Sequence, residues 1–90
     1  MNNEDLINII NYIEHPDIPM SLKDMGIIGY IDIKNNKVTV IFALPDLNMP
    51  NRKDIANSVR IMAESFGYKF EYDFRKMSVD ENKKYLSLLK

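Results

Sequence analysis

Apolar residues near the start of the chain recur with the spacing of an amphipathic helix. The stripe has members at i, i+3, i+4 and i+7, which are Leu6, Ile9, Ile10 and Ile13. Asn2 or Asn3 can cap the start of this helix. Pro16 is predicted to end it, because the residue before a proline favours an extended backbone.

Two later segments carry the same kind of signal. Apolar residues recur at helical spacing over 51–66, and Gly67 follows as a residue that readily adopts the left-handed conformation of a helix stop. The tetrapeptide Ser78-Val79-Asp80-Glu81 is a capping-box sequence, in which the first and fourth side chains satisfy each other's backbone N–H groups. It predicts a C-terminal helix that reaches about residue 89.

Three segments predict β-strands. The first two, 27–34 and 37–44, are separated only by Asn35 and Asn36, and asparagine tolerates the positive φ of a two-residue hairpin turn. The third, 68–75, alternates aromatic with charged residues. Its aromatic face consists of Tyr68, Phe70, Tyr72 and Phe74.

The predicted order is helix, strand, strand, helix, strand, helix. This order indicates one α+β domain over residues 1–90, with a small three-stranded sheet and helices packed on its apolar face. The aromatic face of the third strand is expected to lie in that core. A three-stranded sheet also has exposed edges, and homodimerisation is one way to cover an edge.

Composition narrows the classes of function. The chain has 12 basic and 13 acidic residues and a formal net charge of −1, without the basic surplus typical of a nucleic-acid-binding protein. It has no apolar run long enough to cross a bilayer, and it opens with acidic rather than basic residues, unlike a signal peptide. We therefore expect a cytoplasmic protein. The chain has no cysteine, so its activity cannot depend on a thiolate.

The loops hold the few residues with distinctive chemistry. His15 is the only histidine, and its position predicts an exposed side chain at a helix end. Asp17 is expected to organise a turn, and Asp24 to anchor loop amides within a short helical turn that Ser21 caps and Gly26 closes. An alternative is a metal or cluster site formed by His15, Asp17 and Asp24. Three loop methionines, which suit an adaptable docking surface, are Met20, Met25 and Met49.

Several short motifs, in their order and spacing, resemble those of the iron–sulfur cluster assembly domain family, which includes SufT-like and PaaD-like proteins. They are His15-Pro16-Asp17-Ile18-Pro19, Asp24-Met25-Gly26-Ile27-Ile28, and the tail Met77-Ser78-Val79-Asp80-Glu81. The resemblance covers nearly the whole chain and implies the same order of elements. It also implies a role in the maturation or delivery of iron–sulfur clusters, exerted mainly through other proteins.

The resemblance further implies a reactive cysteine just before the second helix, and this chain departs from it there. Met49 stands in the cysteine's place before Pro50. A thioether has no proton to lose and is a weak, soft ligand, so it cannot hold iron or carry sulfur as a thiolate does. His15 stands where the family usually has an aspartate, and the chain has no tryptophan.

These observations lead to a first hypothesis of a non-catalytic protein-interaction module that needs no cofactor. Its partner would belong to the iron–sulfur assembly machinery or be a client apoprotein. The residues expected to contact it are Asp17, Asp24, Gly26, Met49 and Pro50. Besides the metal or cluster site, a second alternative is an accessory factor of a multi-subunit oxygenase, as the PaaD-like branch implies.

Overall fold

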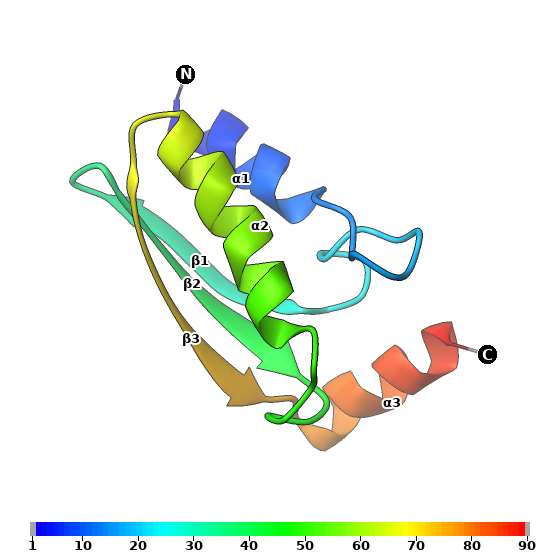
Figure 1. Cartoon of the computed structure of the whole chain (residues 1–90). Helices are drawn as coiled ribbons and strands as arrows, with labels where there is room; N and C mark the ends of the chain where they lie inside the picture. Colours follow the sequence, from blue (N-terminus) through cyan, green and yellow to red (C-terminus); the bar gives the residue numbers. More distant parts are fainter. Residues whose placement is uncertain (1, 90) are drawn as a thin grey trace.

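The computed structural model describes residues 2–89 and contains the predicted elements in the predicted order (Figure 1). The elements are α1 (Asn3–Asn11), β1 (Ile28–Lys34), β2 (Lys37–Leu44), α2 (Arg52–Ser65), β3 (Lys69–Lys76) and α3 (Val79–Leu88). The strands form one sheet in the order β1-β2-β3, in which β1 is antiparallel and β3 parallel to β2. The α+β class and the three-stranded sheet are thus confirmed.

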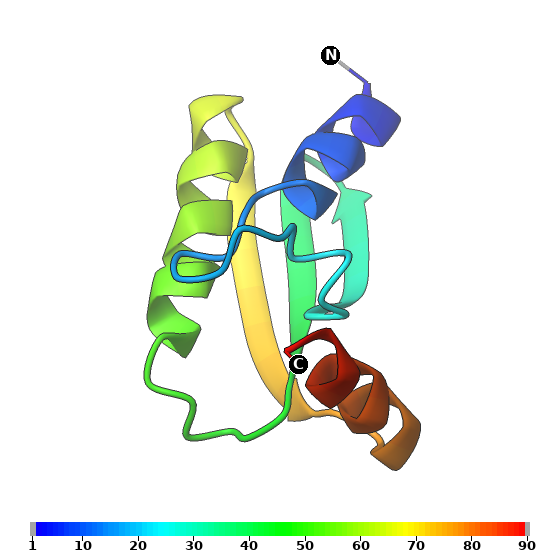
Figure 2. The same ribbon diagram turned by 90° about the vertical axis from the view of Figure 1, so that its right-hand side faces the viewer.

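Two helices cover one face of the sheet. α1 contacts β1 and α2, and α2 contacts β2 and β3, so the two helices lie side by side (Figures 1 and 2). α3 lies beyond the carboxyl ends of β2 and β3. Within residues 2–89, every helix is too short or too polar to cross a membrane.

α1 ends earlier than the prediction, at Asn11 rather than near Pro16. The reason lies in the backbone that follows. The C=O of Ile13 accepts the N–H of Leu22 at 2.8 Å, and the N–H of His15 donates to the C=O of Met20 at 3.0 Å. These bonds pair residues 13–15 with residues 20–22 as a short antiparallel ladder. The ladder uses backbone N–H and C=O groups that would have to bond within α1 if the helix continued.

The two local turn predictions are confirmed. Asn35 and Asn36 have φ of 54° and 61° and form the hairpin turn. The Oγ of Ser21 accepts the N–H of Asp24 at 3.1 Å, and Gly26 has a φ of 74°, although the segment forms consecutive turns rather than a helix.

The core lies between the helices and the central strand. On β2 the alternate residues that face the helices are fully buried, namely Val38, Val40, Phe42 and Leu44. The prediction that the aromatic face of β3 lies in the core is wrong for Tyr72, whose side chain is 46% exposed, whereas Phe70 and Phe74 are half-buried and pack against the core. β3 is an edge strand, so its aromatic rings have a neighbouring strand on one side only.

Within residues 2–89 no helix packs on the opposite face of the sheet, yet Ala43 on this face is fully buried. Arg75 of β3 pairs in register with Ala43 of β2, and its guanidinium reaches as far as Gly29 of β1. The side chain therefore crosses over Ala43. Glu81 at the start of α3 holds the guanidinium through two hydrogen bonds of 2.8 and 3.0 Å.

Candidate functional site

Two loops that are distant in sequence border a cavity of about 470 Å³ that is open to solvent. One loop follows α1 and the other joins β2 to α2, and α3 closes the side. The lining residues are His15, Asp17, Ile18, Met49, Pro50, Asn51, Asp54 and Tyr85. The structure thus brings together four residues singled out from the sequence, which are His15, Asp17, Met49 and Pro50.

His15 is buried, with only 6% of its surface exposed, so the prediction of an exposed side chain is wrong. The backbone ladder that ends α1 early turns the ring inward, toward the start of α2. Its Nδ1 lies 3.0 Å from the backbone N of Asp17, and its Nε2 lies 3.2 Å from Nδ2 of Asn51. The ring therefore connects both loops.

The surroundings of His15 favour a neutral imidazole. Burial lowers its pKa, and the nearby Asp17 carboxylate opposes this effect only in part. Both ring nitrogens also face N–H donors, from the Asp17 backbone and the Asn51 amide. A neutral ring can accept at one nitrogen, whereas a charged ring can accept at neither.

Asn51 connects the loops a second time. Its Nδ2 donates to Oδ2 of Asp17 at 3.0 Å, a contact between residues 34 positions apart. Asn51 is the N-cap residue of α2, but its side chain makes no capping hydrogen bond. Among residues 2–89, its buried Oδ1 has no hydrogen-bond partner. The side chain thus serves the contact between the loops rather than the helix.

Met49 is held in place through its backbone. Its N–H donates to the C=O of Asp46 at 3.1 Å, and Nη1 of Arg52 donates to its C=O at 3.0 Å. Oδ1 of Asp46 also accepts the N–H of Asn48 at 2.9 Å, which closes a tight turn. The thioether is half-buried in the cavity wall. The loop therefore presents Met49 on an ordered backbone.

Asp24 and Gly26 do not reach this cavity. Asp24 is exposed and its backbone is bonded to Ser21, while Gly26 ends the same turn. The structure therefore does not join His15, Asp17 and Asp24 into one site. Among residues 2–89, no group of three His, Cys, Asp or Glu side chains is placed to hold a metal ion.

Besides Ile18, which lies next to Asp17 in the first motif, three lining residues were not singled out from the sequence: Asn51, Asp54 and Tyr85. The first two lie one and four positions after Pro50. The first turn of a helix that directly follows a site loop lies close to that site, so the position of these two residues after Pro50 could have predicted their place in the lining. Tyr85 is buried on α3, and its position depends on where α3 docks, so no local pattern reveals it.

Comparisons with known proteins show the fold. A solved structure described as a domain of unknown function, DUF59, from Bacillus anthracis superposes with a TM-score of 0.72. The two chains are 12% identical, and the superposition covers 94% of this chain and 89% of the other. No protein-family profile matches the chain. No curated protein matches it in sequence.

Proposed function

We propose that this protein is a non-catalytic docking module, related to the iron–sulfur cluster assembly domains and acting in the cytoplasm. Its partner would be a cluster-assembly protein or a client apoprotein that contacts the loops around the cavity. The support for the family relation is twofold: the chain has the fold of a DUF59 domain, and its motifs resemble those of the cluster-assembly family in order and spacing.

The chemistry of the cavity supports a role without catalysis. Met49 supplies a thioether, which neither ionises nor attacks a sulfur species. A neutral His15 ring has one accepting nitrogen, and each ring nitrogen faces a neighbouring N–H donor, so its lone pair is engaged within the loops and is not free to take a proton from a bound molecule. Asp17 is already bonded to Asn51. The polar groups thus hold the two loops together.

The shape and surface of the site support docking. The cavity combines apolar walls from Ile18, Met49 and Tyr85 with the carboxylates of Asp17 and Asp54. Leu47, in the same loop as Met49, is 46% exposed. Apolar side chains on a well-held loop are what a partner can bury on binding. The site that carries the proposal is therefore the cavity wall around Met49.

A photo-crosslinking experiment tests the proposal. The photoreactive residue p-benzoylphenylalanine is placed at Leu47, and in a control protein at Tyr30, which is 51% exposed on the open face of the sheet. We expect the Leu47 protein alone to capture a cluster-assembly protein or an iron–sulfur apoprotein in the cells that express it. We also expect Met49→Glu to weaken this capture. Equal capture from both positions, or a captured protein unrelated to clusters, would contradict the proposal.

A second experiment separates docking from cluster carriage. The purified protein is incubated anaerobically with iron and sulfide, and in parallel with zinc, and the bound metal is measured after desalting. We expect no stoichiometric metal, because a thioether and a single imidazole whose accepting nitrogen is engaged within the loops cannot replace a set of thiolates. A stable coloured cluster that passes to an apoprotein would overturn the non-catalytic role.

A further inference from the structure

The outer edge of β3 offers backbone groups for pairing. Within residues 2–89, β3 is paired only with β2. The N–H of Lys69 donates to Asn36 and that of Met77 to Leu44, both on the β2 side. Backbone groups alternate sides along a strand, so those of the even-numbered residues point outward.

One of these outward N–H groups is already occupied. Oδ1 of Asp73 accepts the N–H of Phe74 at 2.8 Å, which blocks the edge at that position. Within residues 2–89, no strand and no loop backbone bonds to the outward N–H and C=O groups of Phe70 and Tyr72, so these groups remain available. The unprotected part of the edge is therefore short, and it is centred beside the exposed ring of Tyr72.

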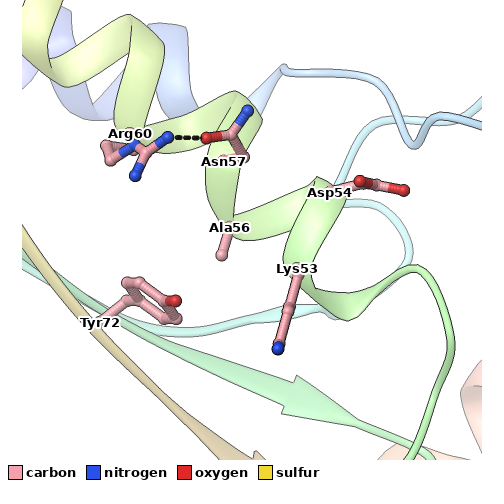
Figure 3. A pocket seen from close by; sticks show the side chains of 6 residues that line it. All are labelled: Lys53, Asp54, Ala56, Asn57, Arg60 and Tyr72. Carbon is pink, nitrogen blue, oxygen red and sulfur yellow. Dashed lines mark hydrogen bonds between the residues drawn. The ribbon is translucent and has the colours of Figure 1, made fainter.

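A pocket of about 300 Å³ lies next to this part of the edge, between α2 and β3. Lys53, Ala56 and Arg60 lie along the side of α2 that faces Tyr72 (Figure 3). Arg60 donates to Oδ1 of Asn57, which orients the guanidinium. Asp54 also lines the pocket, but its carboxylate points away from Tyr72 (Figure 3).

The pocket thus brings together the ammonium of Lys53, the guanidinium of Arg60 and the phenol hydroxyl of Tyr72, with the small methyl group of Ala56 between them. The first three donate hydrogen bonds, and two of them carry positive charge. Ala56 leaves space between the two cations, where a larger side chain would fill the gap between helix and strand. The pocket is therefore suited to a carboxylate.

We propose that an extended segment of a partner protein adds to β3 as a fourth strand and places a glutamate or aspartate side chain in this pocket. Backbone pairing with Phe70 and Tyr72 supplies affinity, and the pocket supplies specificity, as in other cases of strand addition beside a helix. This surface lies on the β3 side of α2 and shares only Asp54 with the lining of the cavity around Met49, so the inference goes beyond the docking function proposed above.

The side chains of β3 on the pocket's own face identify the occupant as a different protein. On this face the strand carries Phe70, Tyr72 and Phe74, so a second copy paired through its own β3 edge would bring aromatic rings, and no carboxylate, to the two cations. A second copy paired antiparallel about Tyr72 would also set Glu71 opposite Asp73, and like charges destabilise a strand pair. Opposite charges meet in the neighbouring registers, but the carboxylate is missing in every register.

Synthetic peptides test the inference by NMR titration of the ¹⁵N-labelled full chain. The probe is the acetylated, amidated peptide Thr-Val-Thr-Glu-Thr-Val-Thr, whose central Glu and flanking Val side chains share one face. We expect saturable amide shifts at Phe70, Tyr72 and the first half of α2. Replacement of the peptide Glu by Lys should weaken binding by about tenfold or more, because like charges then meet in the pocket.

Two further comparisons separate strand addition from simple charge attraction. The double variant Lys53→Glu, Arg60→Glu should weaken binding by about tenfold or more, while Lys83→Glu, Lys84→Glu on α3 carries the same charge change and should leave binding unchanged. One peptide is N-methylated at Glu and both Val residues, and another at the Thr residues. The N–H groups of alternate residues point to opposite sides of an extended peptide, so only one of the two methylated groups of N–H faces β3. One of these peptides should therefore lose binding and the other should keep it.

Several results would overturn the inference. They are no saturable shift at millimolar peptide, equal binding of the Glu and Lys peptides, and insensitivity to both methylation patterns. Shifts at Phe70 and Tyr72 that grow with the concentration of the protein alone would identify a second copy as the occupant. Retained folding of each variant is checked in the same NMR spectra.

Discussion

The substitution Gly29→Ala probes the contact that joins all three strands across the open face. A Cβ at Gly29 would lie 3.0 Å from Nη2 of Arg75 and 3.0 Å from the carbonyl oxygen of Ile41. Both separations are shorter than ordinary van der Waals contact. The guanidinium cannot move freely, because Glu81 holds it and also accepts the N–H of Ser78 at 2.9 Å. The added methyl group therefore strains a connected set of bonds.

The expected cost of Gly29→Ala in folding free energy combines three contributions. Overpacking of this kind typically destabilises by about 1–3 kcal/mol. The lower chain entropy of alanine in the unfolded state offsets about 0.5–1 kcal/mol. The Arg75–Glu81 pair is partly exposed, so its weakening adds at most about 0.5 kcal/mol. We expect Gly29→Ala to lower the free energy of unfolding by about 1–2 kcal/mol.

A double-mutant cycle with Arg75→Ala assigns the cause. Removal of the guanidinium takes away two of the three atoms nearest to the new methyl group, so the cost of Gly29→Ala should fall by about 1 kcal/mol in that background. Urea unfolding of the four proteins, followed by circular dichroism, measures each value. Asp32→Ala, an exposed change on the same strand, is the control and should stay within about 0.5 kcal/mol. An unchanged cost of Gly29→Ala in both backgrounds would refute the role of Arg75.

Three other predictions concern local features. Burial lowers the pKa of His15, so the unfolded chain takes up a proton first as pH falls below about 6.5. The free energy of unfolding, measured with urea, should therefore be highest above that pH and should decrease below it, by at most about 1.4 kcal/mol per pH unit. The decrease should stop below the pKa of His15 in the folded protein. His15→Gln should lack this decrease. Asn36→Ala should destabilise the folded protein by about 1 kcal/mol, because alanine disfavours the φ of 61° at this position. Asn36→Gly should not destabilise it. Equal thermal midpoints of the two variants would contradict this prediction. Ser78→Ala removes the N-cap acceptor of α3 and should cost about 1 kcal/mol in urea unfolding, with Ser87→Ala as a neutral control.

Local chemistry explains which parts of the fold could be predicted from the sequence. The Asn35–Asn36 turn, the capping box at Ser78 and the left-handed helix stop at Gly67 each depend on residues a few positions apart. All three are confirmed. The end of α1 is set by hydrogen bonds between residues 13–15 and 20–22, whose partners no periodic pattern specifies.

The candidate site was harder to predict because its contacts are distant in sequence. The burial of His15 depends on Asn51, 36 positions later, and the lining by Tyr85 depends on the docking of α3. The motifs correctly drew attention to the two loops, which do lie together. They did not indicate that Asp24 and Gly26 belong to a separate turn.

The parallel pairing of β3 with β2 has a consequence for the order of folding. β1 and β2 meet through a two-residue turn, whereas β3 reaches its register only after the whole segment from Leu44 to Lys69 has closed. A chain halted at the hairpin would therefore lack both the strand edge at Tyr72 and the joined loops at His15. Both surfaces therefore require chain that follows the hairpin, the loop at Asn51 for the joined loops and β3 for the strand edge, and neither can bind a partner before that chain has folded.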